Sequence, residues 1–220
     1  MAVSVVLVGV LLCGPVGAGQ GRASRDGAGY REGADFVVRN LGLRRNSVVV
    51  DIGAGDGWWS SKMAEKLGPK GVIHAAEVEQ GKVDSMKSKW AAVPQINPYL
   101  CPTDGTGLQE DTCDLAFISK TYHHLGKDGR LEYLKHLANV IKPTGRLVIV
   151  EQHSALTRST HSGHPGEIAA QAEQAGWMTL KVVMIPNSDH FMAIFVQPDG
   201  FRQQIEKQME AARQKQAAGQ

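Results

Sequence analysis

The sequence has few of the residues that mark several common protein classes. Its three cysteines, Cys13, Cys101 and Cys113, form no C-x-x-C pair, so the spacing indicates neither a zinc knuckle nor a disulfide-stapled scaffold. Lys and Arg number 24 against 22 Asp and Glu, a formal net charge of +2, which is too small for the cationic face that nucleic acids require. Charged residues make up 21% of the chain and hydrophobic residues 42%, so wholesale disorder is not expected. The 220 residues therefore predict one packed domain that does not bind nucleic acid.

The first thirty residues differ from the rest. The segment 2–13 is almost wholly apolar and is followed by Gly14, Pro15 and small residues up to Ala18, a pattern typical of a short signal peptide cleaved after residue 18. The apolar run is shorter than the roughly 20 residues that a spanning helix needs, so we expect no stable membrane span after cleavage. If residues 1–18 act as a signal peptide the protein is exported to the periplasm or secreted, and otherwise it is cytoplasmic. Residues 19–30 are rich in Gly and polar residues and predict a linker.

Strand and helix patterns alternate along the rest of the chain. Short β-branched or apolar runs are followed by apolar residues at helical spacing, including a helical stripe from Leu131 to Ile141 that Pro143 ends. Repeated βα units predict an α/β fold with a doubly wound, mainly parallel seven-stranded sheet and helices on both faces. The link 186–189 is short enough for a hairpin, so we expect the last strand to be antiparallel. The strands are expected at 48–50, 72–76, 96–101, 114–119, 146–150, 180–185 and 191–196, with late helices at 165–175 and from Phe201.

A glycine-rich loop follows the first strand in the segment DIGAGDG, residues 51–57. Alternate glycines let the backbone turn sharply and let a ligand approach without a Cβ in the way. The following helix offers unpaired N–H groups that suit a carboxylate or a phosphate. These features fit a dinucleotide or S-adenosylmethionine. The dinucleotide fingerprint G-x-G-x-x-G is not matched, because Trp58 or Ser60 stands where its last glycine belongs.

Acidic residues end three successive strands beside this loop. Asp51 ends the first, Glu77 the second, and Asp104 follows the third. In a doubly wound sheet these ends share one edge, where Glu77 can accept hydrogen bonds from both ribose hydroxyls. Asp104 is placed to accept one from an exocyclic amino group such as that of adenine. The three acids together predict a nucleotide-cofactor site.

On these motifs the sequence resembles the class I S-adenosylmethionine-dependent methyltransferases, in the small-molecule branch that includes quinone-biosynthesis-like enzymes. The resemblance spans about residues 30–197 and is carried by the segments VVVDIGAGDGWWS (48–60), VIHAAEVEQ (72–80), DLAFISKTYHHL (114–125) and KPTGRLVIVEQH (142–153). It implies a methyltransferase domain at 31–198, a helical tail at 199–220 and S-adenosylmethionine as cofactor. The cofactor-binding residues that it implies are Asp51, Gly53, Ala54, Gly55, Gly57, Glu77, Val78, Asp104, Gly105, Ser119, Lys120 and Thr121.

Histidines gather after the fourth and fifth strands. Methyl transfer to an O–H or N–H nucleophile needs a base near neutral pKa, and His123 or His124, on the rim where ligands bind, is the candidate. The alternative is that the pair only shapes the pocket. Several of these residues are potential metal ligands, but their spacing matches no helical H-x-x-x-H arrangement, and we expect no metal. The predicted substrate-binding residues are Tyr122, Glu151, His153, His161, His164 and His190.

The sequence thus predicts a methyltransferase that acts on a small-molecule nucleophile with an O, N or C acceptor. One alternative is a catalytically silent nucleotide-binding domain of the same fold. Export favours this alternative, because S-adenosylmethionine is made inside cells. A less favoured alternative is an NAD(P)-dependent oxidoreductase. The sequence fixes neither the acceptor nor the oligomeric state.

Overall fold

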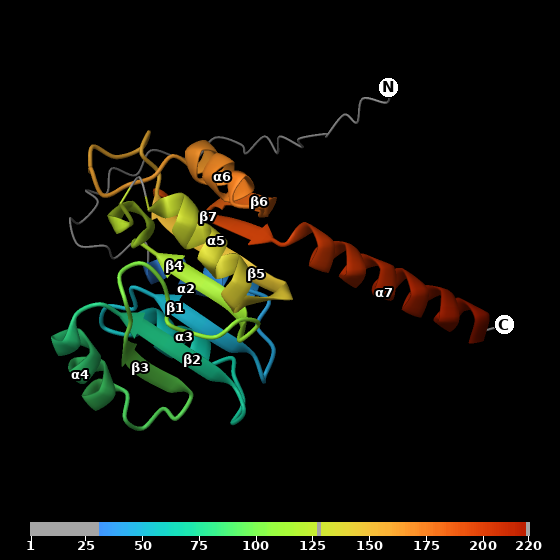
Figure 1. Cartoon of the computed structure of the whole chain (residues 1–220), viewed down its shortest axis with the longest axis horizontal. Coiled ribbons are helices and arrows are strands. Elements are labelled where there is room, and N and C mark those ends of the chain that lie inside the picture. Colours follow the sequence, from blue (N-terminus) through green and yellow to red (C-terminus); the bar gives the residue numbers. More distant parts are fainter. Residues whose placement is uncertain (1–30, 127–128, 219–220) are drawn as a thin grey trace.

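A computed structural model describes residues 31–126 and 129–218, so the predicted signal peptide (1–18) and linker (19–30) lie outside the described residues (Figure 1). The sheet has seven strands in the order β3-β2-β1-β4-β5-β7-β6. Strands β1 to β5 pair in parallel, whereas β7 is antiparallel to both β5 and β6. The predicted α/β sheet and its antiparallel last strand are confirmed. The strands are β1 (Val48–Ile52), β2 (Val72–Glu77), β3 (Ile96–Leu100), β4 (Cys113–Ser119), β5 (Ile141–Gln152), β6 (Met178–Met184) and β7 (His190–Val196).

Helices cover both faces of the sheet, and successive side chains of a strand pack against opposite layers. In β1, Val49 belongs to the hydrophobic cluster on one face of the sheet, and Val50 belongs to the cluster on the opposite face. Strands buried on both faces explain why β1 reads as a continuous apolar run. One layer holds α2 (Ala34–Asn40), α3 (Trp58–Ala64) and α4 (Gln80–Lys89), and the other holds α5 (Arg130–Val140) and α6 (Pro165–Gln174).

Several element ends differ from the sequence prediction, most of them by one or two residues. Ile141, expected as the last member of a helical stripe, instead pairs with Cys113 and opens β5, so α5 ends at Val140. An apolar residue at that position fits either a helix stripe or a strand, and pairing with β4 decides between them. The expected strand 180–185 lies at 178–184. The tail helix α7 (Pro198–Ala218) begins at its proline rather than at Phe201, because proline is well suited to the first helical position.

Helix α7 extends away from the sheet, and the C-terminal half of the helix projects beyond the body of the domain (Figure 1). Ile205 and Met209 on this helix are exposed. Over residues 31–126 and 129–218, no helix has both the length and the apolar character required to cross a membrane.

The order of the strands creates a crevice at one edge of the sheet. After β1 the chain moves outward to β2 and β3, whereas β4 lies on the other side of β1 and leads to β5. The loops that follow β1 and β4 therefore diverge at the carboxyl ends of these neighbouring strands. Open α/β sheets bind ligands at such a switch point.

The glycine that precedes α3 provides a test of the backbone geometry in the loop after β1. Gly57 has φ +72°, and a Cβ there would lie 2.6 Å from Nε1 of Trp90. We expect Gly57→Ala to lower the free energy of unfolding by about 2 kcal/mol or more, from left-handed strain and the clash. Gly81→Ala is the matched control, because a Cβ at Gly81 in α4 meets nothing within 4 Å, and it should stabilise by roughly 0.5–1 kcal/mol. Urea unfolding of both variants checks this, and equal effects would contradict it.

Candidate active site

The glycine loop after β1 is tied to its neighbours on both sides. The N–H groups of Gly53 and the next residue both donate to the carbonyl of Ala76 at 3.0 Å, at the end of β2. The hydroxyl of Thr121, in the loop after β4, donates to the carbonyl of Gly53 at 3.5 Å. Gly53 has φ +67°, and a Cβ there would lie 2.3 Å from Oγ1 of Thr121. A larger residue at position 53 would therefore separate the loops that define the crevice.

Glu77 points into the glycine loop. Glu77 is the last residue of β2 and is only 4% exposed. One carboxylate oxygen accepts a hydrogen bond from the N–H of Gly55 at 3.0 Å, and the other accepts one from the N–H of Val78 at 2.8 Å. The carboxylate is thus fixed at the base of the crevice with lone pairs left for further donors.

The crevice encloses a cavity of about 760 Å³. Nine of the residues that the resemblance and the sequence singled out line this cavity. They come from the ends of the first four strands, as the order of the strands requires. These nine are Gly53, Gly55, Glu77, Val78, Asp104, Ser119, Lys120, Thr121 and His124.

Four of the proposed cofactor residues do not line the cavity. Asp51, Ala54, Gly57 and Gly105 are absent from its walls. Asp51 lies beneath the loop, fully buried, and accepts a hydrogen bond from the hydroxyl of Ser60 at 2.6 Å. Burial raises the pKa of Asp51 to about 7, and the hydrogen bond from Ser60 opposes this shift. Asp51 therefore joins β1 to α3 from within the protein.

Sequence reasoning missed several cavity residues that come from helices and from the third strand. Lys82 in α4, Glu132 and Tyr133 in α5, and Cys101 after β3 contribute to the walls. No local motif marks these positions, because helix packing over the carboxyl edge brings them there.

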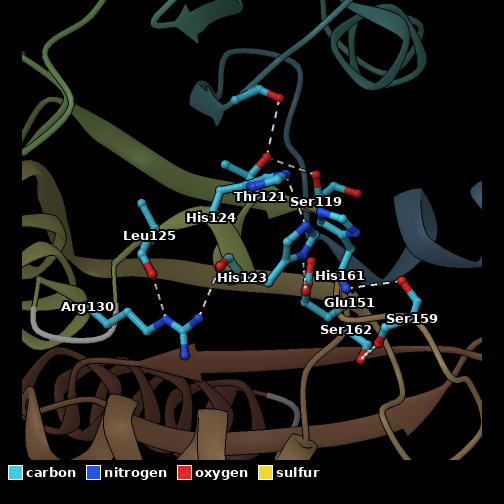
Figure 2. Close-up of polar contacts among 11 residues, drawn as sticks. Ser119, Thr121, His123, His124, Leu125, Arg130, Glu151, Ser159, His161 and Ser162 are labelled. Atoms are coloured by element: carbon cyan, nitrogen blue, oxygen red, sulfur yellow. Dashed lines mark hydrogen bonds and ion pairs between the residues drawn. The ribbon is translucent and has the colours of Figure 1, made fainter.

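The predicted catalytic histidines and Glu151 form a series of polar contacts (Figure 2). Nε2 of His124 lies 3.1 Å from Nε2 of His123, whose Nδ1 lies 2.7 Å from Oε2 of Glu151. His124 lines the cavity, whereas the side chains of His123 and Glu151 are 7% and 0% exposed. The ring of His161 lies 5.2 Å from that of His123 and 5.5 Å from that of His124.

Burial controls the charge of this cluster. It lowers the pKa of His123 to about 4, and electrostatic effects of His124, His161, Lys120 and Arg130 act in the same direction. Burial also raises the pKa of Glu151 to about 8, against the opposing effect of Lys120 and Arg130. Although the distance between His123 and Glu151 fits an ion pair, the two shifts indicate a neutral pair near pH 7, because burial penalises both charges.

The remaining predicted substrate residues do not line the main cavity. The hydroxyl of Tyr122 donates to Gln171 in α6. This bond connects the turn η1 (Tyr122–His124), whose Tyr122 ring is buried, to α6. His164 caps α6 by accepting the N–H of Gly166 at 3.2 Å. His153 lies with its ring centroid 5.7 Å from that of His164. His190 is buried, with Nδ1 2.8 Å from a carboxylate oxygen of the preceding aspartate.

Within the described part of the chain, no group of three or more His, Cys, Asp or Glu residues has the arrangement needed to hold a metal ion. The histidines contact one another through a hydrogen bond and through ring packing.

Known methyltransferases are similar to this chain. The family described as methyltransferase domain matches residues 49–145. Among curated proteins, the demethylmenaquinone methyltransferase of Staphylococcus aureus (strain JH9) is 22% identical over 115 residues, which is 52% of this chain and 47% of the relative. The chain thus spans about half the length of the curated relatives that it matches.

Solved structures match over more of the chain. A SAM-dependent methyltransferase from Aquifex aeolicus superposes with a TM-score of 0.68 at 22% identity, over 74% of this chain and 88% of that one. The 1,6-didemethyltoxoflavin-N1-methyltransferase of Burkholderia thailandensis, solved with 1,6-didemethyltoxoflavin and S-adenosylhomocysteine, gives 0.61 at 20% identity, over 78% and 79%. The fold is that of the class I S-adenosylmethionine-dependent methyltransferases. Residues 49–145 are similar to a methyltransferase domain, and the fold is similar to that of the SAM-dependent methyltransferase from Aquifex aeolicus.

The buried acid beneath the glycine loop predicts a pH dependence of stability. Asp51 has a folded pKa of about 7 against an ordinary value of 3.8, so between these pH values the folded state holds a proton that the unfolded state has lost. Stability should fall as pH rises through this window, by up to roughly 1.4 kcal/mol per pH unit from this group. Asp51→Asn, which cannot ionise, should lose this part of the slope. Urea unfolding at several pH values from 4 to 8 measures it, and identical slopes for both proteins would refute the assignment.

Proposed function

We propose that this protein transfers a methyl group from S-adenosylmethionine to a small-molecule nucleophile. The observation that carries the proposal is the position of Glu77, whose carboxylate is held against the N–H of Gly55 at the wall of the cavity. The match of residues 49–145 to the methyltransferase domain family supports the same activity.

The residues present fit this cofactor. The Glu77 carboxylate is positioned to accept hydrogen bonds from sugar hydroxyls, and Asp104, which also lines the cavity, is available for the amino group of the base. Gly55 leaves room for a ligand against the backbone, because a Cβ there would lie 4.0 Å from the carbonyl oxygen of Gly53. The cavity volume of about 760 Å³ falls within the roughly 300–1,000 Å³ of small-molecule sites.

Bound S-adenosylmethionine supplies a methyl carbon activated by a positively charged sulfur. The protein must then align the acceptor, exclude water and, for an O–H or N–H acceptor, remove a proton. Of the two candidate bases, His124 lines the cavity, and His123 lies behind it with its side chain buried. We therefore assign contact with the acceptor to His124.

The relatives support a proposal for the acceptor class. The curated relative is named for demethylmenaquinone and one structural relative for N1 of 1,6-didemethyltoxoflavin. We propose that this protein also takes a ring compound, one with an ionisable hydroxyl or amino group. A silent binding domain is the second candidate, and it predicts cofactor binding without turnover.

Calorimetric titration separates the cofactor hypotheses. We expect S-adenosylhomocysteine to bind and NAD to give no signal. Glu77→Gln should weaken the binding of S-adenosylhomocysteine by about 10- to 150-fold, because hydrogen bonds to a charged group contribute roughly 1.5–3 kcal/mol. Glu65→Gln is the matched control, since Glu65 is exposed and its side chain pairs with Lys62. Tight binding of NAD without a response to S-adenosylhomocysteine would reject the proposal.

Turnover is tested with methyl-labelled S-adenosylmethionine and a panel of phenols, quinols and aromatic amines. We expect label in at least one product and a loss of about 10²- to 10⁴-fold in kcat for His124→Ala, the usual contribution of a general base. Affinity for S-adenosylhomocysteine should stay close to that of the unaltered protein. Cofactor binding with no labelled product across the panel would favour the silent domain.

A further inference from the structure

The hydrogen bonds of the histidine cluster continue past the cavity into the protein interior. His124 stands at the cavity wall, His123 behind it, and Glu151 at the end of β5 is completely buried. The two contacts, 3.1 Å and 2.7 Å long, are within the range of good hydrogen bonds. The mechanism proposed above uses only the first of these three residues.

A count of protons limits the protonation states of the hydrogen-bonded series His124, His123 and Glu151. A neutral imidazole has one N–H and one acceptor nitrogen, so the contact between the two Nε2 atoms holds one proton. In the first state, His124 donates through Nε2 to His123, and His123 donates through Nδ1 to an ionised Glu151. In the second state every donor is reversed: protonated Glu151 donates to Nδ1 of His123, and His123 donates through Nε2 to His124. In both states the two histidines are neutral.

The second state holds one proton more than the first. In the first state Nδ1 of His124 carries a lone pair, and in the second state it carries a proton. We propose that Glu151 is the final acceptor of the proton that the methyl acceptor releases, reached through His124 and His123. The inference rests on the proposed function of the cavity, and it assigns to Glu151 and His123 a positioning and relay role for the same reaction.

The step balances in atoms and charge. The O–H or N–H bond of the acceptor breaks and its proton binds Nδ1 of His124, while the freed electron pair forms the new bond to the methyl carbon. The Nε2 proton of His124 passes to Nε2 of His123, and the Nδ1 proton of His123 passes to Oε2 of Glu151. The leaving sulfur keeps the electron pair of its former bond to carbon and becomes neutral. Glu151 ends as a neutral acid, and later loss of its proton to solvent restores the first state.

The surroundings of Glu151 favour a group that can take up a proton. Among the described residues, Oε1 has no hydrogen-bond partner, which a neutral acid tolerates better than a carboxylate does. The charged and titratable groups that face Glu151 are His123 from η1, Lys120 after β4, Arg130 from α5 and the Tyr122 hydroxyl. The two cations oppose its protonation, yet burial outweighs them and raises the pKa to about 8. His123, whose pKa lies at about 4, transmits a proton and does not retain one.

Contacts to Arg130 hold the histidines in register. Its Nε donates to the carbonyl of Leu125 at 2.9 Å and its Nη2 to the carbonyl of His123 at 3.3 Å (Figure 2). The guanidinium also lies over the ring of Tyr122, 5.0 Å from its centroid. The backbone of η1 is therefore clamped on both sides of His124, so the two rings keep their contact without the acceptor.

The test starts with the full-length protein and no acceptor, so it does not depend on turnover. Infrared difference spectra from pH 6 to pH 10 should show a protonated carboxyl band that disappears with a midpoint near 8, and this band should be absent in Glu151→Gln. Nitrogen NMR of the histidines should show His123 and His124 exchanging tautomers at the same midpoint. His74→Asn is the control, because His74 lies in β2 and contacts none of the three residues. A carboxyl band that does not titrate in this range, or histidine tautomers that stay fixed while it does, would overturn the relay.

Turnover then links the relay to the reaction. With an acceptor found in the panel, kcat should rise with pH through an apparent pKa near 8, and Glu151→Gln should lose this rise and on the order of 10-fold or more in kcat. Binding of S-adenosylhomocysteine should stay unchanged in the variant, so failure of the relay is distinguishable from failure of the proposed function. If Glu151→Gln does not fold, His124→Gln should lose turnover yet keep a protonated carboxyl band. An unchanged pH profile in Glu151→Gln would reject the proposal.

Discussion

The contact between the Glu77 carboxylate and the N–H of Gly55 is the constraint on which the site depends. It joins the end of β2 to the loop after β1, and it does so with a side chain that is almost fully buried. A buried carboxylate without donors is costly, but hydrogen bonds from two backbone N–H groups offset much of that cost. The same bonds hold the carboxylate where a ligand can reach it. One interaction therefore fixes both the shape of the loop after β1 and the position of the Glu77 carboxylate.

The opposite side of the crevice depends on the approach of β4 to β1. Thr121 follows β4 and contacts Gly53, and the short turn that carries the histidines begins immediately afterwards. The backbone leaves β4 through Lys120, a residue other than glycine with a positive φ of 53°, which is strained and occurs where the surroundings enforce it. Since Lys120 also donates its N–H to Val150 of β5, the turn is fixed to the sheet. The histidines thus belong to a rigid element rather than to a free loop.

Much of the fold followed from the sequence because its signals are local. Continuous β-branched runs such as Val48–Val50 mark strands buried on both faces, and Gly53 and Gly55 mark the loop after the first of them. The position of Glu77 was predictable from its place at a strand end. The contact between His123 and Glu151 was not, because it depends on the register of β4 against β5 and on burial of both side chains. For the same reason Ile141 was assigned to a helix, since only its pairing partner Cys113 distinguishes the two alternatives.

Two buried acids with raised pKa values lie near the crevice, and their partners separate their roles. Asp51 accepts a hydrogen bond from the hydroxyl of Ser60. A hydroxyl accepts a proton far less readily than a neutral imidazole does, so this pair does not pass protons on. It stabilises the contact between β1 and α3. Glu151 contacts an imidazole, which can accept a proton at one nitrogen and release another from the opposite nitrogen. Burial alone would make both acids protonatable. Of the two, only Glu151 is connected to the cavity through groups that can exchange protons, and the proposed relay depends on this connection.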